Sequence, residues 1–327
     1  MTAHLRVLSL LPSATEIVAA LGAGDQLVGI THECDYPAAV RSCERVTECA
    51  IDSLAAPAAI DAQVREITGQ GLPLYTLREA AIAALRPDLI LTQALCEVCA
   101  VMESDVRALA TRLTPEPRVI SLSATSLDAV FADIALVGAA LQLGSDAEEL
   151  IAGFRDRLHA VHVTLKAARA PRPRVAVIEW GDPIFAGGHW VPEMVHRAGG
   201  IDVLATAGQH SQVVSLDAVI AADPEIVLIS PCGYGIDRAA AEAQRLFALA
   251  EWRFLLTRPV WALDANALTS RPGPRLVDGI EVMARIFNPS LFSPINASMA
   301  RAVRRPPPVG PSKYVGSIQP IQGAVTR

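Results

Sequence analysis

Long hydrophobic runs and an excess of positive charge are both missing from this sequence. No apolar run approaches the ~18 residues of a membrane span, although 51% of the 327 residues are hydrophobic. The formal net charge of −6 argues against nucleic acid or an anionic membrane as the main partner. Charged residues make up 19% of the chain, which is typical of a globular protein and excludes wholesale disorder. The length allows two domains with cores of their own.

The start of the chain lacks the features of an export signal. The sequence MTAHLRVLSLLPSATEIV passes directly into a buried-strand pattern at Arg6, without a basic region, a hydrophobic segment or a cleavage site. It therefore predicts a cytoplasmic protein, or a periplasmic one if the start is mis-assigned.

Cysteines and the common catalytic motifs are scarce as well. Six cysteines in a chain of this length do not indicate a disulfide scaffold. No Ser/His/Asp triad, P-loop or Gly-x-Gly-x-x-Gly motif follows a predicted strand, which argues against hydrolases, kinases and dehydrogenases. We therefore expect a binding protein and not an enzyme.

What the sequence does contain is an alternation of short apolar strands and amphipathic helices in both of its halves. Strands are predicted at Arg6–Leu11 and Leu89–Thr92, and the pattern restarts with a strand at Arg174–Ile178. The stretch Leu216–Leu228 parallels Arg78–Leu91 almost position for position. Continuous apolar strands between such helices are typical of a parallel sheet covered on both faces. The sequence thus predicts an α/β fold with two Rossmann-like lobes, each built on a parallel sheet.

A long helix, predicted over Ser145–Arg169, separates the two halves. Ser145 and Glu148 form a predicted capping box at its start, and Ser13 and Glu16 form another at the start of the first helix. An apolar stripe runs along the long helix at helical spacing, made of Ile151, Phe154, Leu158, Val161 and Leu165. The expected organisation is an N-terminal lobe (1–144), a linking helix (145–170), a C-terminal lobe (171–288) and a disordered, proline-rich tail (289–327).

The loops after the strands carry large flat side chains. Ligands of open parallel sheets bind beyond the carboxyl ends of the strands, so these loops are the candidate site. Tyr36, Trp180 and Trp190 lie in them and suit a large, flat, partly apolar ligand. Packing of each tryptophan against its own lobe is the alternative. Arg271 and Arg275 could donate to amide or phosphate oxygens, or else cap the last helix or form surface pairs.

Two of these loops also carry potential metal ligands. His32 and Cys34 follow one strand, and Cys96 and Cys99 follow another. One imidazole and three thiolates satisfy a tetrahedral zinc site. The same residues could hold iron in a cluster, form a disulfide, ligate a metal inside a bound cofactor, or be ordinary loop thiols.

Several segments resemble one known family, the Fe/cobalamin-type (class III) periplasmic substrate-binding proteins, and especially its cobalamin-binding branch. The resemblance spans roughly residues 5 to 288. It is carried by RVLSLLPSATEIVAALG, LVGITHECDYP, ALRPDLILTQ, AADPEIVLIS and LTSRPGPRLVDGI. His32, Cys34 and the Cys96-x-x-Cys99 loop are not part of the family's general pattern.

The resemblance implies a bilobal protein that holds a corrinoid between its lobes and hands it to the permease of an ABC importer. Glu79 and Asp217 hold the places of acidic residues that dock on such a permease, although a carboxylate at a helix start also favours the helix dipole. The implied ligand-facing residues are Ser13, Asp35, Tyr36, Trp180, Trp190 and Arg271, and His32 is a candidate ligand of the cobalt ion.

The sequence therefore favours a monomeric protein that binds cobalamin or a related corrinoid, with zinc or iron possible at the Cys/His loops. A metal- or tetrapyrrole-handling, chelatase-like enzyme is the first alternative. An iron-chelate or haem binding protein is the second.

Overall fold

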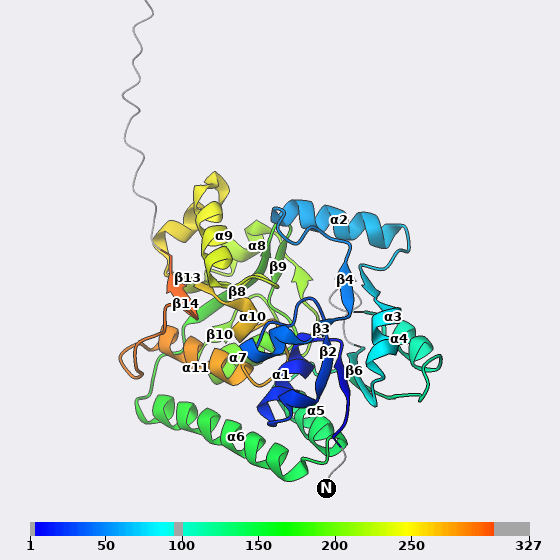
Figure 1. Cartoon of the computed structure of the whole chain (residues 1–327). Helices are drawn as coiled ribbons and strands as arrows, with labels where there is room; N and C mark the ends of the chain where they lie inside the picture. The colour runs from blue at the N-terminus through cyan, green and yellow to red at the C-terminus, as the bar shows by residue number, and fades with distance from the viewer. Residues whose placement is uncertain (1–3, 95–100, 304–327) are drawn as a thin grey trace, which may run out of the picture.

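The structure, a computed structural model, describes residues 4–94 and 101–303 and consists of two α/β lobes joined by a long helix (Figure 1). The prediction of two such lobes is confirmed. In the described residues no helix is long and apolar enough to cross a membrane.

The first lobe is built on a parallel sheet with helices on both faces. Its strands are buried on both sides because their apolar residues face a different helical layer in each direction. In the described part of the chain the order is β3 (Glu44–Arg45), β2 (Leu27–Ile30), β1 (Val7–Ser9), β6 (Leu89–Gln93) and β7 (Arg118–Leu122). One face is covered by α1 (Pro12–Ala20) and α5 (Leu127–Ala140), and the other by α3 (Glu79–Leu85) and α4 (Glu103–Ala110).

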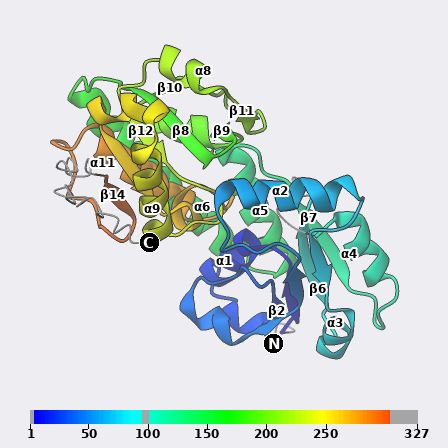
Figure 2. The same cartoon turned by 90° about the horizontal axis from the view of Figure 1, so that it is seen from above.

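A separate antiparallel pair, β4 (Thr47–Cys49) and β5 (Tyr75–Leu77), stands beside this sheet and carries α2 (Pro57–Gly69) between its strands. Seen from above, α2 lies along the first lobe and begins close to the second (Figure 2).

The second lobe repeats the parallel plan in its centre, where β8, β12 and β13 are parallel, but its edges differ from the prediction. Three of the described strands, β9, β11 and β14, run antiparallel to their neighbours. The strands are β8 (Arg174–Gly181), β9 (Ile184–Ala186), β10 (Ile201–Asp202), β11 (Gln212–Val213), β12 (Ile226–Ile229), β13 (Val260–Leu263) and β14 (Ala300–Ala302). The helices are α7 (Val191–Arg197), α8 (Leu216–Ala221), α9 (Ile236–Ala248), α10 (Ala265–Leu268) and α11 (Leu276–Phe287).

The last described segment, 289–303, was expected to belong to a disordered tail. It is instead part of the second lobe, because β14 pairs with the edge strand β13. Residues 304–327 lie outside the described residues.

The linking helix is α6 (Gly144–Ala167), within two residues of the predicted limits. The predicted stripe faces the protein: Ile151, Phe154, Leu158 and Val161 are buried. The predicted capping box is wrong, because the helix begins one residue earlier, after Leu143, and no side chain caps it. It packs against α5 of the first lobe and against α7 and α11 of the second.

Replacing Phe154 with alanine should lower the free energy of unfolding by about 3–5 kcal/mol, the usual cost of such a core cavity. The Phe154 ring is buried and stacks on Phe131 with 6.2 Å between ring centroids. Val163→Ala is the control, since Val163 lies on the exposed face of the same helix. Urea denaturation measures both variants, and equal small losses would contradict the buried position of Phe154.

Candidate ligand-binding site

The two lobes meet where the strands of both sheets end, at the start of α1. Gly273 of the second lobe lies directly against Ser13 of the first. A Cβ atom added at Gly273 would stand 3.5 Å from the Ser13 Cβ atom. Ser13, Asp35, Tyr36 and Arg271, which the sequence places far apart, thus come together at this junction.

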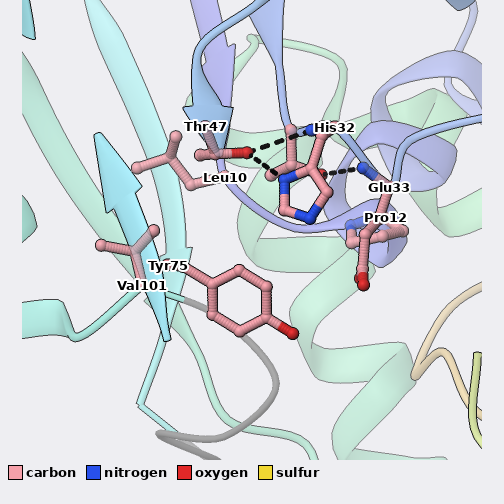
Figure 3. A pocket seen from close by; sticks show the side chains of 8 residues that line it. Leu10, Pro12, His32, Glu33, Thr47, Tyr75 and Val101 are labelled. Atoms are coloured by element: carbon pink, nitrogen blue, oxygen red, sulfur yellow. Dashed lines mark hydrogen bonds between the residues drawn. The ribbon is translucent and has the colours of Figure 1, made fainter. Parts of the chain in front are cut away.

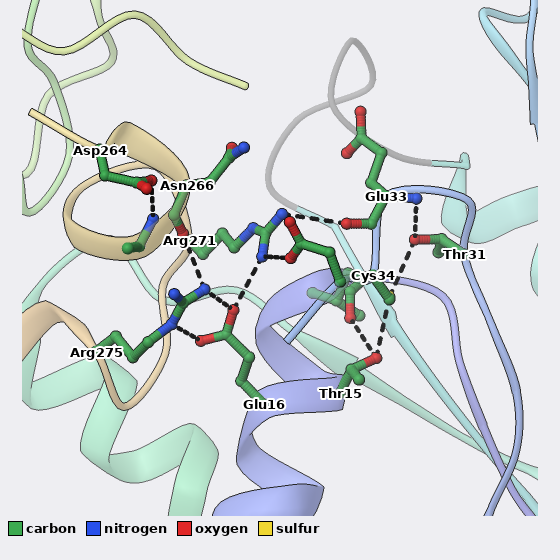
Figure 4. A network of polar contacts seen from close by, with 12 residues as sticks. Thr15, Glu16, Thr31, Glu33, Cys34, Asp264, Asn266, Arg271 and Arg275 are labelled. Atoms are coloured by element: carbon green, nitrogen blue, oxygen red, sulfur yellow. Dashed lines mark hydrogen bonds and ion pairs between the residues drawn. The ribbon is translucent and has the colours of Figure 1, made fainter. Parts of the chain in front are cut away.

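The centre of the junction is the carboxylate of Glu16 on α1 (Figure 4). Arg275 donates to it through two atoms, Nε to Oε2 at 2.8 Å and Nη2 to Oε1 at 2.5 Å. Arg271 donates from Nη1 to Glu16 Oε1 at 3.1 Å and to Asp35 Oδ1 at 2.6 Å. The predicted capping box of Ser13 and Glu16 is therefore wrong: α1 has no side-chain cap, and Glu16 binds the other lobe instead.

The centre of this ion network is buried. Only 2% of the Glu16 side chain is exposed. Burial alone would lower the pKa of Arg271, but Asp35 and Glu16 raise it above its ordinary value, so Arg271 stays charged. Glu16 and Asp35 together balance the two positive charges. Arg271 also donates from Nη2 to the carbonyl oxygen of Glu33.

An exposed aromatic ring covers the edge of the network. The Arg275 guanidinium carbon lies 4.2 Å from the centre of the Tyr36 ring, a cation–π contact. The ring itself is 48% exposed, so it can present its free surface to a ligand. The sequence singled out both arginines and Tyr36, but it assigned Glu16 to a cap of its own helix, because nothing local distinguishes a glutamate that caps its own helix from one that binds across lobes.

His32 lines a small hollow on the first lobe (Figure 3). Its Nδ1 lies 2.7 Å from Thr47 Oγ1, and its ring stacks on Tyr75 with 5.5 Å between ring centroids. Its Nε2 atom has no hydrogen-bond partner among the described residues. Burial, helped by the charge of Arg45, lowers the pKa of His32, so the imidazole is neutral at neutral pH. The hollow holds about 10 Å³, enough for one water molecule.

Unlike the His32 imidazole, the Cys34 thiol is not accessible to a ligand or a metal ion. Its Sγ atom is buried and lies 3.1 Å from the hydroxyl oxygens of both Thr15 and Thr31. Burial raises the pKa of this thiol, which disfavours the thiolate that metals require. Within residues 4–94 and 101–303 no group of three His, Cys, Asp or Glu side chains is placed to hold a metal ion. Cys96 and Cys99 lie outside the described residues, so the predicted four-residue metal site stays a prediction.

The two predicted tryptophans of the second lobe have different surroundings. Trp180, near the end of β8, is partly buried and packs edge-on against Tyr234, with 5.6 Å between ring centroids. Trp190 is only 5% exposed, and its Nε1 donates to the carbonyl oxygen of Thr269 at 2.7 Å. Trp180 therefore lies near the carboxyl end of β8 and stays partly exposed, whereas Trp190 is buried inside its own lobe.

The predicted docking residues lie on different lobes. Glu79 begins α3 and forms an ion pair with Arg112 at 2.7 Å. Asp217 is exposed in the first turn of α8. Figure 2 shows α3 and α8 far apart, at the outer ends of the two lobes.

Comparison with known proteins identifies the class. Residues 7–265 match the family described as "Periplasmic binding protein", and the chain belongs to this family. This confirms the predicted family and the prediction of a substrate-binding protein, and it rules against the chelatase-like enzyme.

Two relatives of known name are similar to this chain over most of its length. The vitamin B12-binding protein of Vibrio cholerae is 25% identical over 277 residues, covering 84% of this chain and 86% of that protein. The cobalamin-binding protein of Halobacterium salinarum is 26% identical over 294 residues, covering 86% of this chain and 69% of that protein.

Solved structures show the same fold. A periplasmic haem-binding protein from Pseudomonas aeruginosa has a TM-score of 0.68 at 22% identity, covering 91% of this chain and 98% of that one. The periplasmic vitamin B12-binding protein of Vibrio cholerae has a TM-score of 0.58 at 24% identity, covering 87% and 97%.

Glu16→Ala should lower the free energy of unfolding by about 3–5 kcal/mol, because it leaves two largely buried arginines without the buried carboxylate they share. The control is Glu44→Ala, which removes an exposed ion pair with Arg78 and should cost less than about 1 kcal/mol. Both are measured by urea denaturation. Similar small losses for the two variants would show that the junction does not depend on Glu16.

Proposed function

We propose that this protein binds cobalamin or a related corrinoid between its two lobes, as the substrate-binding protein of an ABC importer. The names of its relatives in Vibrio cholerae and Halobacterium salinarum support this ligand, at 25% and 26% identity. Ser13, Asp35, Tyr36 and Trp180 are the proposed contact residues of the facing edges, with Arg271 holding Asp35 in place.

The charge balance at the junction is the observation that carries the proposal. A haem presents two carboxylates, which need cations, whereas a corrin ring presents neutral amides. Arg271 and Arg275 are already neutralised by Glu16 and Asp35, so a ligand carboxylate would have to break a buried network to reach them. A ligand amide can instead donate to Asp35, whose side chain is 46% exposed.

Aromatic surface at the facing edges supports the same ligand class. Tyr36 of the first lobe is half exposed, and Trp180 of the second is partly buried. Rings of this size stabilise a large macrocycle mainly by removing apolar area from water. Trp190 serves this surface indirectly, by fixing the backbone at Thr269.

An iron-porphyrin ligand is the second candidate, favoured by one observation. The imidazole of His32 and the phenol of Tyr75 line the same hollow, and both groups are known types of haem iron ligand. The same His32 Nε2 atom could ligate cobalt in a corrinoid, because a neutral imidazole suits either metal.

Delivery to a permease is the second part of the proposal. Glu79 and Asp217 are exposed carboxylates on opposite lobes, which suits contact with two copies of a cationic partner surface. The family description is periplasmic, so we propose that the protein acts outside the cytoplasm. Cell fractionation measures the compartment directly.

Calorimetric titration tests the ligand. We expect cyanocobalamin to bind one to one and haem to compete poorly. Trp180→Ala should weaken cyanocobalamin binding about tenfold, since a buried aromatic contact contributes about 1.5 kcal/mol. Trp261→Ala is the matched control, because Trp261 lies in the same sheet at the antiparallel edge with β14 and should leave the affinity unchanged. Binding of haem alone would refute the corrinoid proposal in favour of the second candidate.

His32→Ala tests direct ligation of the metal. If Nε2 binds cobalt, the absorption spectrum of bound aquocobalamin should change in this variant, because the imidazole is replaced by water. His162→Ala, on the exposed face of α6, is the control and should leave the spectrum as it is. An unchanged spectrum in His32→Ala would exclude ligation by His32 while leaving corrinoid binding intact.

A further inference from the structure

A second contact between the lobes lies away from the Glu16 junction. Arg238, in the first turn of α9 in the second lobe, donates both arms of its guanidinium group to backbone carbonyl oxygens of the first lobe. One acceptor is the oxygen of Ser53, and the other is the oxygen of Ala55 at 2.8 Å. Charged donors make the stronger hydrogen bonds, so this arginine clasps the opposite lobe.

The clasped segment, residues 50–74, is here called the strap. It leaves the first lobe at Cys49 and returns at Tyr75, where β4 and β5 pair. Its helix α2 lies wholly in the described part of the chain, yet only Pro57 of that helix is buried. Leu54, between the two clasped carbonyls, is 85% exposed. A segment with so little buried apolar surface opens easily unless something else holds it.

Arg238 is itself anchored beside the proposed ligand. Its guanidinium carbon lies 3.7 Å from the centre of the Tyr234 ring, and that ring packs edge-on against Trp180. The clasp therefore ties the strap to the aromatic end of the second lobe, next to a residue proposed to contact the ligand.

The position of the clasp suits a gate. Two other contacts lie on or beside the linking helix: Glu193 of α7 accepts from the backbone nitrogen of Leu127 at the start of α5. Arg157 of α6 pairs with Glu281 of α11 at 2.9 Å. In Figure 1, α6 lies at one edge of the molecule, whereas α2 and α9 lie at the opposite edge. A rotation of the lobes about the α6 side would therefore separate Arg238 from the strap first.

We propose that the Arg238 clasp holds the strap as a gate that must release before a ligand enters or leaves. The proposal rests on the proposed ligand site between the lobes. The clasp joins two segments of this chain, so it can be tested without adding a ligand.

Hydrogen exchange tests the clasp. In Arg238→Ala, peptides from residues 50–74 should exchange about tenfold faster, because two hydrogen bonds from a charged donor are lost. Peptides from α6 should exchange as before, which shows that the fold is kept. Arg253→Ala is the matched control, an exposed arginine of the same lobe, and should change neither region. Unchanged exchange in the strap would overturn the proposal.

Binding kinetics test the gate. Stopped-flow mixing with cyanocobalamin should give association and dissociation about tenfold faster in Arg238→Ala, with the Kd changed less than threefold. Arg238→Lys, which keeps the charge but loses one arm, should fall between the two proteins. Rates equal to those of the unmodified protein would overturn the gate. Faster dissociation with unchanged association would also overturn it, because Arg238 would then be a direct ligand contact.

The two proposals fail differently. If the unmodified protein binds neither cyanocobalamin nor haem, the proposed function fails, and the exchange experiment still decides whether the clasp holds the strap. If cyanocobalamin binds but its association and dissociation rates are the same in Arg238→Ala, the gate fails and the proposed function stands.

Discussion

The carboxylate of Glu16 is the group on which the arrangement of the two lobes depends. Removing a carboxylate from water costs several kcal/mol, and only close, well-oriented cations can offset that cost. Both of its cations, Arg271 and Arg275, come from the other lobe. The first lobe therefore contains a helix whose charge is satisfied only when the second lobe is docked. Docking of the lobes is in this sense part of folding.

The contacts between the lobes are unequal, and this limits how the molecule can move. Close to α6 they are the Glu193 contact at the start of α5 and the Arg157 ion pairs with α11, and the buried Glu16 carboxylate adds a contact at α1. At the opposite edge the contact is one arginine on two backbone carbonyls. A small rotation that opens that edge while the α6 side stays fixed breaks the fewest contacts, so it needs the least free energy.

The sequence was a good guide to the elements and a poor guide to contacts between distant elements. Apolar strands and the stripe on α6 follow from local periodicity, and the duplicated pattern led to the two lobes. Both predicted capping boxes were wrong. The Glu16 carboxylate binds Arg275, 259 positions away, and does not bind the backbone amides of its own helix. No local rule reveals such a competitor.

The aromatic residues show the same limit. Trp180 and Trp190 look alike in sequence, ten positions apart, each near glycines. One ends beside Tyr234 at the facing edge, and the other donates into the core at Thr269. The two side chains differ in their surroundings because the chain folds back through β9 between β8 and α7. Local sequence patterns do not predict this path. Arg238 was missed for a similar reason, since its acceptors are carbonyl oxygens, which every residue has.

The pairing of β14 with β13 extends the second lobe beyond α11. Trp261, Ala262 and Leu263 would otherwise form an open, largely apolar edge with unpaired backbone groups. Such an edge invites pairing with another molecule. A fragment ended at Phe287, after the last helix, would keep every helix of the fold and yet be prone to aggregate. A unit meant for expression or for fusion to another protein must therefore include β14 and extend at least to Val303.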